Sequence, residues 1–161
     1  MAFTMFGRTI RKIGVIGSGN IGPDIALHFS QNLYAHGVPV VVVDIIQSAL
    51  DAGSKKAGSK MVKAAEKGIY KKEAADAIFK NMVFTTDYGK IANADFVIEA
   101  AFERMDVKHK IFDQCQASCP KTAIFGRTAH ASATRNLNEE GPSQRPSVGN
   151  TACIPVTRWK N

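Results

Sequence analysis

The chain has 161 residues, of which 45% are hydrophobic, and carries a formal net charge of +7 at neutral pH. This length supports one domain with a hydrophobic core and leaves no room for a second full domain. No apolar run reaches the roughly 18 residues of a membrane-spanning helix. The first residues also lack the apolar centre and cleavage site of a secretory signal, so we expect a cytoplasmic protein without a membrane partner.

The cysteines and the charge exclude further classes. The number of cysteines is odd, since the chain has Cys115, Cys119 and Cys153, and this argues against a disulfide framework. The cysteines also lack the second ligand pair of a metal site. We therefore expect reduced thiols and no metal.

Basic residues gather between Lys55 and Lys72, where a solvated helix face and a site for a polyanion are both open interpretations. No zinc-finger spacing or helix-turn-helix pattern accompanies them, so no nucleic-acid partner is predicted.

Strands and helices alternate along most of the chain. Residues 12–17 (KIGVIG) form a short β-branched run, and residues 22–37 show helical spacing, with Pro23 in the first turn and Gly37 as the stop. Further strands are predicted at residues 38–44, 82–87, 95–101 and 122–126, and helices at about 47–67, 71–79 and 104–118. Near-continuous apolar strands between helices indicate an α/β fold whose parallel sheet is covered on both faces.

The regular pattern stops at Gly126. Residues 127–161 collect Gly, Pro, Ser, Asn and Arg without periodicity, which is typical of a loop or a disordered tail. We therefore divide the chain into an N-terminal extension (1–11), one domain (12–126) and an irregular tail (127–161), which we expect to be an altered or frame-shifted end of the same domain.

A glycine-rich loop follows the first strand and consists of Gly17, Ser18, Gly19, Asn20, Ile21 and Gly22. Gly17 suits a tight turn, and Gly19 allows close approach of a pyrophosphate. Gly22 allows close packing of the helix on the strand. The helix N-terminus adds free N–H groups for phosphate. Asp44 ends the next strand, where it can accept hydrogen bonds from the ribose hydroxyls and repel a 2′-phosphate. These features predict a Rossmann-type doubly wound sheet that binds NAD rather than NADP.

Two other interpretations of the loop are weaker. A tight turn without a ligand would also use glycines. A methyltransferase usually has an acidic residue just before its glycines, where this chain has Val15 and Ile16.

Five segments resemble the 3-hydroxyacyl-CoA dehydrogenase family, in the family's order and spacing: KIGVIGSGNIGPDIALHF, VVVVD, FTTDY, ADFVIEAAFERMDVKHKIF and CPKTAIFG. They lie within residues 12–126, and the VIEAAFE…VK stretch separates this family from most other Rossmann dehydrogenases. The resemblance implies NAD-dependent oxidation of 3-hydroxyacyl-CoA to 3-oxoacyl-CoA in fatty-acid β-oxidation. The GPDIALHF variant resembles a branch in which the domain is sometimes joined to an enoyl-CoA hydratase.

The resemblance also assigns residues. It assigns the glycine loop to the pyrophosphate and Asp44 to the adenosine ribose. It also places Glu103 and Lys108 against the cofactor. The alternative is that Glu103 is simply an exposed acid and Lys108 a solvated lysine. Lys60 and Lys67 fall near where the family meets the CoA phosphates, for which lysine is a good point-charge partner. No residues are left for the helical domain that completes the family's substrate site, so we expect a homodimer or a partner chain that supplies it.

The tail departs from the family pattern where the family carries its chemistry. The family has a serine–asparagine block after the fifth strand and, later, an H-F-F-N-P block whose His is the general base. Residues 127–130 here read RTAH, and alignment of Pro155 puts Thr151 and Ile154 at the base and asparagine positions. His130 stands in the wrong block, so no catalytic residue is assigned. A reading-frame slip is one hypothesis, because codons for Ser-Asn-Ser-Ser read one base late begin Arg-Thr-Ala-His; a natural divergent tail is the other.

We therefore expect a chain that binds NAD and is a poor or inactive catalyst on its own. One alternative is a module that senses NAD without turnover or needs a partner chain. Another is a related NAD dehydrogenase for a different hydroxy acid. The basic stretch from Lys55 to Lys72 favours an acyl-CoA substrate, because a small hydroxy acid needs fewer phosphate partners.

Overall fold

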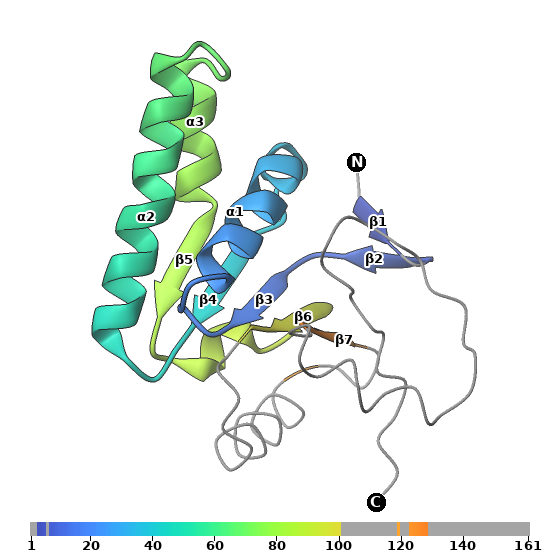
Figure 1. Ribbon diagram of the computed structural model, residues 1–161. Coiled ribbons are helices and arrows are strands. Elements are labelled where there is room, and N and C mark those ends of the chain that lie inside the picture. The colour runs from blue at the N-terminus through green and yellow to red at the C-terminus, as the bar shows by residue number, and fades with distance from the viewer. Residues whose placement is uncertain (1–2, 6, 101–118, 120–122, 129–161) are drawn as a thin grey trace, which may run out of the picture.

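A computed structural model describes residues 3–5, 7–100, 119 and 123–128 (Figure 1). Its centre is a five-stranded parallel sheet in the order β5-β4-β3-β6-β7. The strands are β3 (Ile13–Ile16), β4 (Val40–Val43), β5 (Met82–Thr85), β6 (Phe96–Glu99) and β7 (Ile124–Arg127). All five lie inside the predicted strand ranges or within one residue of them, so the predicted Rossmann-type sheet is confirmed.

The helices follow the predicted order. They are α1 (Gly22–Leu33), α2 (Gln47–Glu66) and α3 (Lys72–Lys80), with short 3₁₀ turns η1 (Tyr34–His36) and η2 (Tyr88–Ile91). Pro23 occupies the first turn of α1, where its missing N–H costs nothing. Gly37 ends the segment with a left-handed φ of 67°, which a glycine adopts without strain. The helix predicted at 104–118 lies outside the described residues.

The first residues of the chain form a small hairpin that the sequence analysis did not predict. Strands β1 (Phe3–Met5) and β2 (Arg8–Ile10) pair antiparallel, and Gly7 between them has a φ of 71°. Ile10 is buried in the main core. The segment treated as an N-terminal extension therefore packs against the domain.

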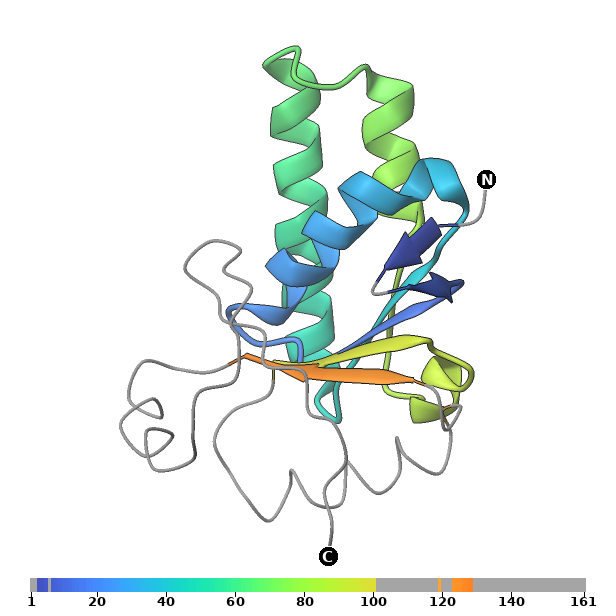
Figure 2. The ribbon, with the colours of Figure 1, turned by 90° about the vertical axis from the view of Figure 1, so that its right-hand side faces the viewer.

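Each face of the sheet has its own apolar cluster, because successive side chains of a strand point to opposite faces. Val15, Val42 and Ile98 belong to the larger cluster, to which α1, α2 and α3 also contribute. Figure 2 shows these three helices together on one side of the sheet. Val43 and Val97 point to the other face, where they pack with Ile91 of η2.

The strand order sets where a ligand can bind. Strand β3 pairs with β4 on one side and β6 on the other, and Ile16 stands opposite both Val43 and Glu99. The chain winds outward from β3 to β5 and then returns to the other side of β3. In open α/β sheets, ligands bind at the carboxyl edge beside this reversal. The glycine loop after β3 and Asp44 after β4 therefore start from the same edge.

Candidate cofactor site

Two glycines of the loop are required by the chain's own packing. Gly17 has a φ of 101°, a conformation that side chains rarely adopt, and its amide donates to the carbonyl of Val43 over 2.8 Å. A Cβ at Gly22 would collide with the carbonyl oxygen of Gly17. The absence of side chains at these two positions lets α1 begin directly against the end of β3.

Gly19 is different, because no described residue requires it to lack a side chain. Among the described residues, no atom lies within 4 Å of the position where its Cβ would stand, and the residue is exposed. Its φ lies outside the left-handed range. The space over Gly19 is therefore open to an approaching ligand, as the predicted pyrophosphate would need.

Backbone donors surround this open space. Among the described residues, the amides of Gly19, Asn20, Ile21 and Gly22 have no hydrogen-bond partner, and α1 has no side-chain cap. A helix N-terminus with free amides has a positive potential that suits phosphate. The loop therefore offers both space and donors to an anionic group.

Asp44 is joined to the loop. Its Oδ2 accepts a hydrogen bond of 2.7 Å from the amide of Ser18, and its Oδ1 accepts one of 3.0 Å from the amide of Ile46. Each carboxylate oxygen has a second lone pair, so both can still accept from ribose hydroxyls. The half-buried carboxylate therefore keeps acceptor capacity beside the glycine loop for the hydroxyl groups of the predicted ribose.

Helix α2 holds the loop from the other side. The buried Ser18 hydroxyl donates to the carbonyl of Ala49 over 3.0 Å. Farther along α2, Lys56 Nζ donates to the carbonyl of Asn20 over 2.8 Å and to Asp24 Oδ2 over 3.0 Å. Neither Lys56 nor Asp24 was predicted from the sequence as a site residue. The signal that could have found them is an acid in the first turn of α1 together with lysines four residues apart on α2.

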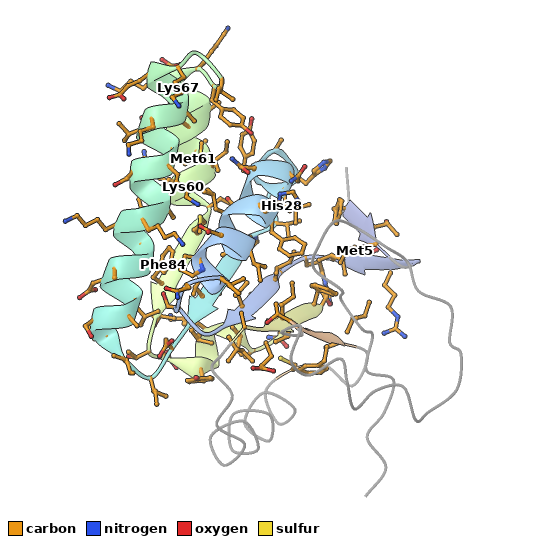
Figure 3. The ribbon with its side chains drawn as sticks, viewed as in Figure 1. Met5, His28, Lys60, Met61, Lys67 and Phe84 are labelled. Atoms are coloured by element: carbon orange, nitrogen blue, oxygen red, sulfur yellow. The ribbon has the colours of Figure 1, made fainter. Side chains whose placement is uncertain are left out.

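The two lysines assigned to CoA phosphates differ in their surroundings. Lys60 Nζ donates to Asp24 Oδ1 over 2.8 Å, so its ammonium group is already paired. Lys67 caps the C-terminal end of α2, is exposed, and has no ion pair within the described part of the chain (Figure 3). Burial raises the pKa of Asp24, but hydrogen bonds from Lys60 and Lys56 outweigh it and leave that pKa below its usual value.

Several predicted positions cannot be placed. Glu103, Lys108, His130, Thr151 and Ile154 lie outside the described residues, as do Cys115 and Cys153. Cys119 is a buried free thiol whose pKa is raised by burial. Within the described ranges, no cluster of three metal-ligating side chains occurs, and no helix combines the length and apolar character needed to cross a membrane.

Comparisons with known proteins point to one family. The family model described as "3-hydroxyacyl-CoA dehydrogenase, NAD binding domain" matches residues 12–149, which extends beyond Gly126 into the tail. The 3-hydroxyadipyl-CoA dehydrogenase of Escherichia coli (strain K12) is 32% identical over 126 residues, which cover 78% of this chain and 26% of the relative. A peroxisomal fatty acid beta-oxidation multifunctional protein of Arabidopsis thaliana is 26% identical over 88% of this chain and 19% of its own length.

A solved structure shares the fold. The crystal structure of 3-hydroxybutyryl-CoA dehydrogenase from Escherichia coli K12 superposes with a TM-score of 0.68 at 30% identity, covering 76% of this chain and 25% of that one. The chain thus spans about a quarter or less of these three relatives. NAD, which the glycine loop and Asp44 predict, is the cofactor of the matched domain. The family match, the fold and the open glycine loop agree. The chain belongs to the 3-hydroxyacyl-CoA dehydrogenase family and matches the NAD-binding domain of that family.

Proposed function

We propose that this chain is the cofactor-binding part of an enzyme that oxidises 3-hydroxyacyl-CoA to 3-oxoacyl-CoA with NAD. One observation carries the proposal. The space over Gly19 is open, and Gly19 lies in the loop that follows β3 and is hydrogen-bonded through the Ser18 amide to Asp44. A bare turn would need neither the open space nor a carboxylate beside it. A dinucleotide needs both.

The residues of the chain would divide the binding between them. The unpartnered amides from Gly19 to Gly22 would donate to the pyrophosphate, and Asp44 would accept from the adenosine ribose. The carboxylate at Asp44 would also repel the 2′-phosphate of NADP. When bound, NAD supplies the hydride acceptor for the carbon that bears the 3-hydroxyl group. Glu103 and Lys108 are proposed to line the same cofactor from the segment after β6.

For the substrate, we propose that the CoA phosphates lie against Lys67 and Lys60. Lys67 supports this because its ammonium group is exposed and has no ion pair within the described residues. Lys60 would have to share its charge between a phosphate and Asp24. The two lysines therefore would not contribute equally, and Lys67 is the stronger candidate.

A second proposal is a cofactor-binding module that needs a partner for turnover. Thr128 favours it, because this residue stands in the block where the family resemblance places serine and asparagine. Its amide and its hydroxyl both donate to the carbonyl of Glu99, over 2.9 and 3.3 Å. That hydroxyl therefore stabilises the end of β6 at the carboxyl edge of the sheet. A partner chain would supply the substrate-binding helical domain.

We propose a cytoplasmic location for the chain. The odd number of cysteines and the bacterial relative that uses 3-hydroxyadipyl-CoA support it. The Arabidopsis relative is named as peroxisomal, so cell fractionation that finds the protein in an organelle would overturn this proposal.

A chimaera tests the proposed activity. Residues 127–161 would be replaced by everything that follows the matching strand in the Escherichia coli 3-hydroxyadipyl-CoA dehydrogenase. With 3-hydroxybutyryl-CoA, we expect NADH to form in the chimaera and not in the chain alone. The same chimaera with Asp44→Ala is the matched control and should lose turnover. A chimaera that binds NADH yet never oxidises a 3-hydroxyacyl-CoA would contradict the enzyme proposal and favour the binding module.

A further inference from the structure

We propose that Lys56 is a positioning residue for the cofactor, which acts from helix α2 by fixing the Asn20–Ile21 peptide of the glycine loop. This inference rests on the proposed binding of NAD. It adds to the loop and Asp44 a residue from an element that the glycine motif does not include.

One face of α2 meets the glycine loop. Four residues of α2 follow one another at helical spacing and so lie along a single stripe of the helix surface: Ala49, Gly53, Lys56 and Lys60. The carbonyl of Ala49 accepts from the Ser18 hydroxyl. A Cβ at Gly53 would collide with that hydroxyl and would come within 2.7 Å of Pro23 Cγ. Helix α2 is therefore docked against both arms of the glycine loop, before Gly19 and after it.

Lys56 continues this stripe to the part of the loop nearest the proposed pyrophosphate. Its Nζ is 2.8 Å from the carbonyl oxygen of Asn20. No peptide bond in the described residues is cis, so the Ile21 amide points opposite to the Asn20 carbonyl within the same peptide plane. By holding the carbonyl toward α2, Lys56 directs the unpartnered Ile21 N–H away from α2. That amide is one of the donors offered to the pyrophosphate.

The charges near this peptide support the same role. Asp24 stands in the first turn of α1, where its negative charge would oppose an incoming diphosphate. Lys56 and Lys60 both donate to its carboxylate, one to each oxygen. Two lysines against one aspartate leave this cluster with a net charge of +1. The cluster therefore removes a repulsion and still offers positive charge at the loop.

Stability alone does not account for Lys56. Its side chain is 40% exposed and that of Asp24 is 39% exposed, and ion pairs exposed to this extent usually contribute little to folding. A water molecule would satisfy the exposed Asn20 carbonyl equally well, so folding does not require this contact. A role in cofactor binding explains why this long side chain is held at this carbonyl.

The test measures NADH affinity by calorimetry and the thermal midpoint of the free protein for Lys56→Met, Lys56→Arg and Lys63→Met. Lys63 is the control, because it is exposed on α2 and its side chain forms no hydrogen bond or ion pair with the described glycine loop. We expect Lys56→Met to weaken NADH binding by about tenfold, as for the loss of one charge-assisted hydrogen bond, with little change in the midpoint. Lys56→Arg should recover most of the affinity, and Lys63→Met should bind as the unaltered chain does.

A second ligand locates the loss. ADP-ribose should lose affinity as NADH does in Lys56→Met, because it keeps the pyrophosphate, whereas adenosine, followed by NMR shifts, should bind unchanged. Equal NADH affinity in the Lys56→Met and unaltered chains would overturn the inference, and so would a failure of Lys56→Arg to recover affinity. If Lys56→Met does not fold, Lys56→Gln takes its place with the same expected result. Failure of the unaltered chain to bind NADH would instead refute the proposed function itself.

Discussion

The amide of Ser18 donates a 2.7 Å hydrogen bond to Asp44, so the acid after β4 is joined directly to the glycine loop after β3. The same carboxylate accepts from the Ile46 amide through its other oxygen. Asp44 therefore has a structural contact with the loop as well as the proposed contact with the ribose. A change at this residue should alter both.

Replacement of Asp44 by alanine should weaken NADH binding by at least about tenfold, because the loop loses a charge-assisted hydrogen bond and the ribose loses its acceptor. The preference for NADH over NADPH should also narrow, since the repulsion of the 2′-phosphate disappears. Calorimetric titration with both nucleotides measures the two effects. Asp51→Ala is the control, because Asp51 is exposed on α2 and, among the described residues, its side chain accepts a hydrogen bond only from Gln47. An unchanged NADH affinity in Asp44→Ala would contradict the proposed site.

Two loop glycines should respond in opposite ways to alanine. At Gly19 the added Cβ meets no atom of the described part of the chain, so the free energy of unfolding should change by no more than about 0.5 kcal/mol while NADH binding falls. At Gly22 the added Cβ collides with the backbone oxygen of Gly17, so the domain should lose about 1–3 kcal/mol or more. Urea denaturation and NADH titration of both variants separate the two outcomes. If Gly19→Ala bound NADH normally, the open space would have no role in cofactor binding.

Glycines within α2 give a similar pair. Gly53→Ala should destabilise the domain, because its Cβ would displace the Ser18 hydroxyl and crowd Pro23, and overpacking of about 1–3 kcal/mol exceeds the gain in helix propensity of about 1 kcal/mol. Gly58→Ala should raise stability by up to about 1 kcal/mol, since its Cβ would only touch the Phe79 ring at 3.4 Å. Thermal unfolding compares them. A stabilised Gly53→Ala variant would show that α2 is not docked on the loop as described.

Much of this arrangement could be predicted from the sequence. The β-branched runs and the G-x-G-x-x-G spacing located β3, the loop and α1, and Asp44 followed from its place at the end of the next apolar run. These features depend on residues close together in the chain. The hairpin of β1 and β2 was missed because two strands of three residues leave no measurable alternation.

The contacts between helices could not be predicted in the same way. The run of lysines from Lys55 to Lys72 indicated a partner for a polyanion, but which lysine meets which group depends on how α2 crosses α1. In the structure, Lys56 and Lys60 both bind Asp24. Nothing in the periodicity of either helix joins an acid in one to lysines more than 30 positions away in the other.

A further prediction concerns the opposite end of the sheet. Asp95 is buried and accepts from the Arg11 amide over 2.8 Å and from its guanidinium over 2.9 and 3.2 Å. The hydrogen bond from the Arg11 side chain is the main reason that the pKa of Asp95 lies below its usual value. Asp95→Asn should therefore lower the thermal midpoint at neutral pH.

The pH dependence of this loss follows from the direction of the pKa shift. Because the pKa of Asp95 is lower in the folded chain, its contribution is complete above the unfolded value of about 3.9 and is lost as the pH falls through the folded value. The difference between the unaltered chain and Asp95→Asn should thus be constant near neutrality and shrink below about pH 4. Asp76→Asn, at an exposed position of α3, is the matched control. A difference that grows on acidification would refute the assignment.

The central claim is that the glycine loop and Asp44 form a working NAD site in this chain. Calorimetric titration of the unaltered protein with NADH, and in parallel with NADPH, tests it most directly. We expect NADH to bind at one site and NADPH to bind much more weakly, because Asp44 repels the 2′-phosphate. Equal affinity for the two nucleotides would contradict the role of Asp44, and no binding of either would contradict the claim as a whole.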